Sequence, residues 1–172
     1  MKKRIITLLT VAFLVLTTVW IVDKIPFTQS IDQEVEAAVY RDGQIIGSTT
    51  VSIKGDKTRY LFRADSFVGE FRVPYVEATD IDELQTQIRW YDPDNYQYIT
   101  HFYKGTFTSA DKRGLVNILL ISEDMDTFAL MTTDLDVIAT SPELQALYLS
   151  HITYHGDSRV TVTDTTGIPP LS

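Results

Sequence analysis

The residues most able to do chemistry include two histidines near the end of the chain. His151 and His155 are four positions apart in a stretch predicted to be helical, and Asp157 follows. This spacing would place two imidazoles on one helical face, as a zinc pair requires. The stretch has no His-Glu-x-x-His arrangement, and exposed histidines at a helix end also suit the helix dipole. We therefore predict no metal and no other cofactor, and keep these three residues as the candidate metal ligands.

Two short motifs resemble catalytic signatures but lack their context. Ser109-Ala110-Asp111-Lys112 has the Ser-x-x-Lys spacing of penicillin-binding enzymes, without the Ser-Asp-Asn and Lys-Thr-Gly partners. Asp164-Thr165-Thr166-Gly167 has one Thr too many for an aspartic protease. The chain has no cysteine, which excludes thiol nucleophiles, thiolate metal sites and disulfides. We predict no enzymatic activity; the alternative is a small cell-envelope hydrolase that uses either a pair of acids or a site centred on His101 or His151.

Aromatic residues concentrate around one predicted hairpin and are the candidate binding residues. Aromatic rings on a sheet can stack on sugars or capture a peptide, and they also stabilise cross-strand pairs. In an extended strand, Tyr96, Tyr98 and Phe102 share one face, and His101 and Tyr103 share the other. At least one face must be core, because both cannot be solvated cheaply. The candidate binding residues are Trp90, Tyr91, Tyr96, Tyr98, Phe102 and Tyr103.

Four clusters of acidic residues raise the question of calcium binding. Calcium needs six to eight oxygen ligands from a closely folded loop. After Asp94, an EF-hand would place an acid or Asn and then a Gly, where this chain has Tyr96 and Gln97. We interpret the clusters as charged turns between strands: Asp80/Asp82/Glu83, Asp92/Asp94, Glu123/Asp124/Asp126 and Asp134/Asp136.

The elements that must position these residues are mostly short strands. The turn Arg41-Asp42-Gly43-Gln44 predicts a hairpin, because Gly supplies a positive φ. A second turn is predicted at Lys54–Lys57. Phe67, Gly69, Phe71 and Val73 alternate with polar residues, and Gly69 indicates a bulge or a close backbone approach. The predicted strands are Val35–Tyr40, Ile45–Ile53, Thr58–Phe62, Phe67–Val73, Thr86–Tyr91, Tyr96–Phe107, Leu115–Ile121, Thr127–Thr133 and Val137–Ala139.

One helix is predicted near the C-terminus. Ser141 is an N-cap residue, Pro142 suits the first helical position, and Gly156 is a plausible stop. Many short strands with Gly, Asp and Pro turns favour a mainly β fold, either an antiparallel sandwich or a barrel, with this one helix packed against it. Residues 157–172 are polar and predicted to be a largely unpacked tail, with Arg159–Thr163 as a possible added strand.

The N-terminal stretch predicts a transmembrane helix. Ile5–Val22 contains no charged residue and follows the basic stub Met1-Lys2-Lys3-Arg4. A span needs roughly 20 apolar residues, and basic residues stay on the cytoplasmic side. We therefore predict a single-pass signal-anchor over residues 5–22, a linker over 23–33 and an extracytoplasmic β-domain over 34–156. The alternative is secretion after cleavage of a signal peptide near Ser30.

The charge of the predicted exported part restricts its partners. Residues 31–172 hold 22 Asp and Glu against 11 Lys and Arg, a net charge of −11. Nucleic acid and anionic lipid surfaces need a cationic face, so we predict no nucleic acid partner and no lipid contact outside residues 5–22. The partners expected are the membrane, through residues 5–22, and an envelope protein or a cell-wall component.

Several loose motifs resemble those of small membrane-anchored or exported β-rich proteins of Gram-positive bacteria. They are the run from Gly55 to Phe62, then Asp65, Phe67–Phe71, Gly105-Thr106-Phe107 and the late Ser-Pro helix. The resemblance implies an anchored β-domain. Because that group has no assigned activity, it implies no catalytic residue. We predict a membrane-tethered extracytoplasmic binding or accessory domain, with a cell-envelope hydrolase or a structural subunit of an envelope complex as the alternatives.

Overall fold

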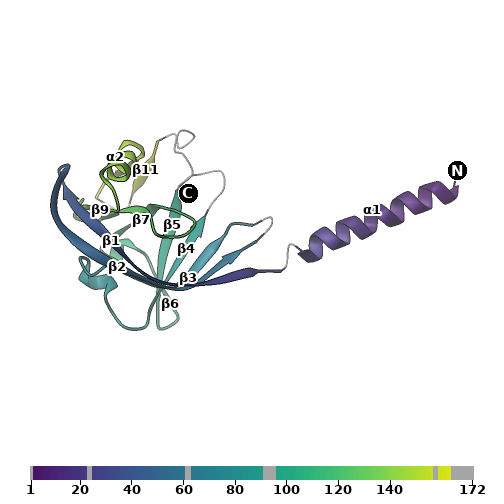
Figure 1. The fold of residues 1–172 in the computed structure, drawn as a ribbon, viewed down its shortest axis with the longest axis horizontal. Helices are drawn as coiled ribbons and strands as arrows, with labels where there is room; N and C mark the ends of the chain where they lie inside the picture. The colour runs from purple at the N-terminus through teal and green to yellow at the C-terminus, as the bar shows by residue number, and fades with distance from the viewer. Residues whose placement is uncertain (1, 23–24, 61–62, 91–95, 157–158, 164–172) are drawn as a thin grey trace.

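A computed structural model describes residues 2–22, 25–60, 63–90, 96–156 and 159–163 (Figure 1). Its first element, the helix α1 (Lys2–Val22), projects away from a β-domain that contains the other elements. The hydroxyls of Thr10, Thr17 and Thr18 donate to backbone carbonyls four residues earlier, at 2.7–2.9 Å, and so are satisfied within the helix. Across these described ranges, no helix has both the length and the apolarity that a membrane crossing requires.

The β-domain is a closed antiparallel barrel of eight strands. These are β1 (Phe27–Arg41), β2 (Gln44–Arg59), β3 (Ser66–Arg72), β4 (Leu84–Trp90), β5 (Gln97–Tyr103), β7 (Leu115–Ile121), β8 (Phe128–Thr132) and β9 (Val137–Ala139). Each strand pairs with the next in this series, and β9 returns to pair with β1. A short extra strand, β6 (Thr106–Thr108), pairs with β5. The prediction of a mainly β fold is confirmed, and the barrel is the alternative that forms.

The first hairpin is much longer than the sequence pattern predicted. β1 begins at Phe27, and its first residues pair with the end of β2, so the predicted linker 23–33 is shorter than expected. The predicted turn at Lys54–Lys57 is wrong, because β2 continues through it. The reason lies on the neighbouring strand, where Gly69 pairs with Gly55. A Cβ on Gly69 would lie 2.5 Å from the Cα of Gly55, so Gly55 is there for a close backbone approach and not for a turn.

Two other turns show the expected use of positive φ. Asp42 and Gly43 have φ of 50° and 77°, which confirms the predicted hairpin turn between β1 and β2. Lys104 and Gly105 repeat this geometry, with φ of 49° and 76°. The predicted long strand Tyr96–Phe107 is therefore divided into β5 and β6.

Side chains fill the interior of the barrel. The alternation predicted for β3 is confirmed, since Phe67, Phe71 and Val73 are buried there. Phe71 and Phe128 face each other from β3 and β8 with ring centroids 5.9 Å apart. A small eight-stranded barrel is just wide enough to be filled in this way. The described part of the barrel is therefore a packed core in which the largest buried apolar side chains meet: Phe67, Phe71, Phe128, Ile53, Ile88, Ile99, Leu115 and Leu119.

A second apolar layer lies outside the barrel, under the C-terminal elements. α2 (Pro142–His151) begins at the predicted N-cap, where the Ser141 hydroxyl accepts a hydrogen bond from the Leu144 amide at 3.2 Å. The helix ends earlier than predicted, because the chain becomes extended at Ile152. β10 (Ile152–Tyr154) then pairs with β11 (Val160–Val162), which confirms the possible added strand. Tyr148 is fully buried beneath this layer.

Candidate functional site

The predicted aromatic binding residues do not form one surface. Trp90 packs against the barrel core, with the Lys57 ammonium 4.5 Å from its ring centroid. Tyr96 and Tyr98 pack against the outer apolar layer, edge to face with centroids 5.5 Å apart. Tyr91 lies outside the described residues. The alternation along β5 therefore separates these rings between the two sides of the barrel wall.

The remaining two rings lie where β5 ends. Phe102 faces outward and meets the exposed Phe107 of β6 edge to face, at 5.8 Å. Tyr103 faces the opposite side, and the guanidinium of Arg113 lies 5.5 Å from its ring. As the hairpin pattern predicted, one face is core. The five candidate rings that the structure describes therefore form no continuous surface, and their role in binding stays a prediction.

The two candidate metal-binding histidines belong to different elements. His151 ends α2, and its Nδ1 lies 3.0 Å from the carbonyl oxygen of Thr163. His155 follows β10, and its Nε2 lies 2.8 Å from the Thr161 hydroxyl. Helical i, i+4 spacing therefore does not apply to the pair, because Ile152 ends the helix between them. Asp157 lies outside the described residues, and no group of three potential metal ligands occurs among those described.

His101 lies inside the barrel wall. It is fully buried, and its Nδ1 is 3.0 Å from the hydroxyl of Thr86 on the adjacent strand. Its Nε2 is buried without a hydrogen-bond partner among the described groups. Burial, aided by the nearby Arg113 charge, lowers the pKa of His101 to about 4. The ring is therefore neutral at pH 7, and the hydrogen bonds of its side chain include none to a carboxylate.

A buried lysine is a feature that sequence reasoning missed. Lys57 is only 1 % exposed, and its ammonium donates a 2.6 Å hydrogen bond to the carbonyl oxygen of Glu123. Burial and the nearby Arg59 charge lower its pKa. Glu123 also accepts a 2.6 Å hydrogen bond from Arg59. The turn between β7 and β8 is thus fixed across one end of the barrel, where Met125 is buried in the core.

A buried carboxylate fixes the opposite end. Asp136 is 2 % exposed and accepts two 2.7 Å hydrogen bonds from Arg41 and one of 2.6 Å from the Tyr75 hydroxyl. The Arg41 hydrogen bonds hold the pKa of Asp136 below its usual range. Its oxygens are already committed to these donors, so this acid serves structure and not calcium binding.

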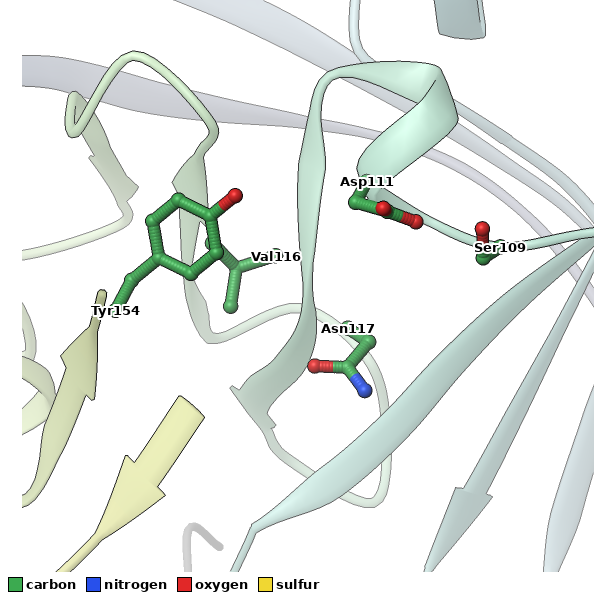
Figure 2. Close-up of a pocket in the computed structure, with 5 residues that line it drawn as sticks. All are labelled: Ser109, Asp111, Val116, Asn117 and Tyr154. Atoms are coloured by element: carbon green, nitrogen blue, oxygen red, sulfur yellow. The ribbon is translucent and has the colours of Figure 1, made fainter. Parts of the chain in front are cut away.

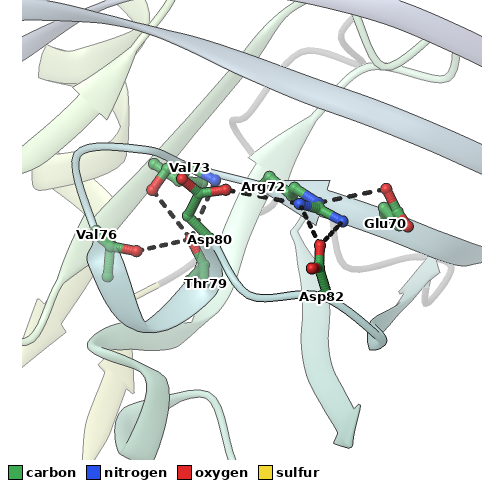
Figure 3. Close-up of polar contacts among 7 residues, drawn as sticks. All are labelled: Glu70, Arg72, Val73, Val76, Thr79, Asp80 and Asp82. Atoms are coloured by element: carbon green, nitrogen blue, oxygen red, sulfur yellow. Dashed lines mark hydrogen bonds and ion pairs between the residues drawn. The ribbon is translucent and has the colours of Figure 1, made fainter.

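The acidic loop after β3 is organised around one arginine (Figure 3). Arg72 lies within 3.3–3.7 Å of carboxylate oxygens on Glu70, Asp80 and Asp82. Desolvation opposes the charge of Arg72, but the hydrogen bonds and charges of these acids raise its pKa overall. Glu77 opens the short helix η1 (Glu77–Thr79) in the same loop. With one cation among several acids, this part of the surface is negative.

The cleft shown in Figure 2 lies on the outside of the barrel, at an irregularity in β7. Between the pairs Leu115–Thr132 and Leu119–Leu130, β7 uses two more residues than β8, so β7 bulges outward from the ladder. The Tyr148 hydroxyl satisfies a bulge carbonyl by donating a 2.8 Å hydrogen bond to Ile118. The cleft has a volume of about 210 Å³ and is lined by Ser109, Asp111, Val116, Asn117 and Tyr154.

The lining of the cleft combines apolar and polar groups from three separate segments. A hydroxyl, a carboxylate, a carboxamide and a phenol contribute to it, but most of the surface that the cleft exposes is apolar. Ligand pockets usually enclose roughly 300–1,000 Å³, so this one has room only for a fragment such as one sugar ring or one side chain. The sequence carried one signal for it: the polar Asn117 interrupts the apolar run Leu115–Ile121.

Comparisons with other proteins give no further assignment. No protein-family model, no curated protein and no solved structure matches this chain. The predicted resemblance to small exported proteins therefore stays a prediction, and the function must be argued from the molecule itself.

Proposed function

We propose that this chain is a membrane-tethered, extracytoplasmic binding module without catalytic activity of its own. The observation that carries the proposal is the exposure of α1. Large apolar side chains along it are 45–70 % exposed, including Leu8, Phe13 and Leu16. Exposed apolar surface of this extent marks contact with a membrane or another protein.

The uncharged part of α1 approaches the length of a membrane span. α1 has 21 residues, but the first three are Lys2, Lys3 and Arg4, so the uncharged stretch of 18 residues extends about 27 Å, a little less than a hydrocarbon core of roughly 30 Å. The basic residues at positions 2–4 favour an orientation with the barrel outside the cell.

The barrel supplies the binding surface on its exterior. Its packed interior excludes a ligand held inside, as a lipocalin holds one. The cleft at the β7 bulge has room for one small group with an apolar body and a polar edge, which suits one unit of a polymer or one side chain of a protein. An envelope polymer or an envelope protein is therefore the proposed ligand class.

The alternative of an envelope hydrolase gains no support from the histidines. Convergence of His101 or His151 with two carboxylates in one cleft would have supported that hypothesis. His101 contacts Thr86 inside the barrel, and His151 contacts the backbone of Thr163 at its exterior. The cleft itself has one carboxylate and no histidine. A structural subunit of an envelope complex would use the same exterior surfaces as a binding module. It would differ only in holding its partner permanently.

The tether is tested with a C-terminal alkaline phosphatase fusion, a reporter that is active only outside the cytoplasm. We expect reporter activity and retention of the full chain in carbonate-washed membranes. Leu9→Arg with Val15→Arg should abolish both, because a charge at a helix centre opposes insertion by about 3 kcal/mol. Ile45→Arg with Phe107→Arg places the same charges on exposed apolar residues of the barrel and should change neither. Recovery of the unaltered chain in the soluble cytoplasmic fraction contradicts the tether.

The binding role of the cleft is tested by sedimentation with purified bacterial cell wall. The detergent-solubilised full chain should sediment with the wall polymer, and Asn117→Leu or Tyr154→Ala should reduce the bound fraction severalfold. Thr153→Ala, on the exposed face of β10, is the matched control. Equal binding by all variants places the polymer contact elsewhere. Absence of sedimentation by the unaltered chain excludes the polymer as the ligand.

A further inference from the structure

Although the barrel closes through the pairing of β9 with β1, the first half of β2 extends beyond β3 and has an unpaired edge. β1 pairs with β2 from Gln44 to Arg59, whereas β3 pairs only with Ser52–Thr58. The segment Gln44–Thr50, here called the β2 edge, therefore has a strand on one side only. Such an edge presents a row of backbone N–H and C=O groups that can pair with another strand.

The reason β3 leaves the sheet is visible in its last residues (Figure 3). The backbone N–H of Val73 donates a 3.0 Å hydrogen bond to the Thr79 hydroxyl, and that hydroxyl also lies 3.0 Å from the Val73 carbonyl. Pro74 follows and has no N–H to offer a ladder. Thr79 is fully buried, so this departure is fixed by the core and the β2 edge stays uncovered by β3.

Among the described residues, the β2 edge carries none of the usual protections against strand addition. Its sequence, Gln-Ile-Ile-Gly-Ser-Thr-Thr, contains no charge and no proline, and it is rich in β-branched residues. Ile45 and Ile46 are 63 % and 47 % exposed, and Thr49 alone in the segment is half-buried. Natural edges are usually blocked by lysine, proline or a covering loop. An unblocked edge of this length is suited to receiving a strand.

The charges around the β2 edge select the occupant. A strand in the position that β3 vacates would run toward the loop 73–83, which holds Glu77, Asp80, Asp82 and Glu83 and no basic residue. Arg72 pairs with Asp80 and Asp82, and Lys104 pairs with Glu83, so the acids of this loop still outnumber the cations beside them. On the other side of β2, Glu34 and Glu36 are exposed on β1 opposite Ser52 and Thr50. The incoming strand therefore meets negative charge along its course, and basic side chains would complement it.

We propose that the β2 edge binds an extended, Lys- or Arg-bearing segment of a partner protein by strand addition. This inference rests on the proposed binding function and names its partner class, but it does not require the membrane tether. Backbone hydrogen bonds to the β2 edge give affinity, and basic side chains beside the acidic loop give selectivity. A second copy of the chain is the weaker occupant, because each copy brings the same acidic loop and a strongly negative domain.

The test uses the detergent-solubilised full chain and two synthetic peptides, Lys-Val-Lys-Val-Thr-Val-Lys and its Glu counterpart. In 50 mM salt, fluorescence anisotropy should show binding of the Lys peptide and at least tenfold weaker binding of the Glu peptide. Hydrogen exchange should show protection of amides within residues 44–50 on binding. The amides of an extended peptide point alternately to its two edges, and strand addition pairs only one of these edges with β2. N-methylation of the amides on that edge should therefore abolish binding.

Two variants separate the sequence-selective contact from general attraction. Glu77→Lys should weaken the Lys peptide about fivefold, the size expected for reversal of one exposed charge. Glu143→Lys makes the same charge reversal in the first turn of α2 and should leave binding within about twofold.

Three results overturn the inference. They are equal binding of the Lys and Glu peptides, protection confined to residues outside 44–50, and protection of 44–50 by self-association without peptide. The phosphatase fusion reports on the tether independently, so failure of either proposal is recognised separately.

Discussion

The pair Gly55–Gly69 gives the sharpest test of the packing described above. A Cβ built on Gly69 would lie 2.5 Å from the Cα of Gly55 and 3.0 Å from the carbonyl carbon of Lys54, and both are backbone atoms. Backbone atoms in a paired strand cannot rotate aside, so Gly69→Ala must separate β2 from β3. Overpacking of this kind costs about 1–3 kcal/mol. We expect Gly69→Ala to lower the free energy of unfolding by about 2 kcal/mol.

The matched control is Gly47→Ala on β2, in the part of that strand that does not pair with β3. A Cβ on Gly47 would have no heavy atom within 4 Å, and its φ is not in the left-handed region. Alanine there restricts the unfolded chain and should stabilise the protein by about 0.5 kcal/mol. The two glycines are both in strands, so strand propensity alone predicts the same sign for both substitutions. Close backbone approach predicts opposite signs.

Urea unfolding followed by Trp90 fluorescence, in a Trp20→Phe background, measures the difference. With a slope of about 2 kcal/mol per molar urea, Gly69→Ala should lower the midpoint by about 1 M and Gly47→Ala should raise it by about 0.25 M. The double variant Gly55→Ala/Gly69→Ala should cost less than the sum of its parts, because the first substitution already separates the strands. A midpoint for Gly69→Ala at or above that of the unaltered protein refutes this account.

Two further predictions concern pH. Burial lowers the folded-state pKa of His101 to about 4, so the neutral ring contributes its full share of the folding stability above pH 6.5, and this share is lost as pH falls toward 4. Acidification from pH 7.5 to 5 should therefore lower the free energy of unfolding by about 2 kcal/mol. In His101→Gln, this loss in urea midpoint should largely disappear. If the urea midpoint of the variant depends on pH as strongly as that of the unaltered protein, His101 is not the group responsible. The pKa of Asp136 is also depressed, so its contribution is complete above pH ~4 and lost below that value. Asp136→Asn should lower the midpoint at pH 7 and reduce the further loss on acidification, and equal midpoints at pH 7 would show that the Arg41 pair contributes nothing.

Local features of the sequence were sufficient to predict several of the elements, although not all of their bounds. The N-cap at Ser141, the Asp42–Gly43 turn and the alternation from Phe67 to Val73 depend on a few neighbouring residues, and all three are confirmed. Gly69 was interpreted as a bulge or a close backbone approach, because these are the usual reasons for a glycine inside an apolar strand, and the close approach is what the structure has. Gly55 was assigned to a turn, since its partner lies on another strand and leaves no trace in the adjacent sequence.

Tertiary structure alone decided the closure of the barrel, the burial of particular charges and the position of the binding surfaces. The pairing of β9 with β1 joins segments about a hundred positions apart, and no local pattern distinguishes it from the pairing of a sandwich. Lys57 and Asp136 are polar residues in predicted turns, but partners on distant strands bury both. The cleft at Asn117 and the open β2 edge arise where pairing is offset or stops. Residue type and spacing determine the strands, whereas register between distant strands determines which surfaces those strands leave available.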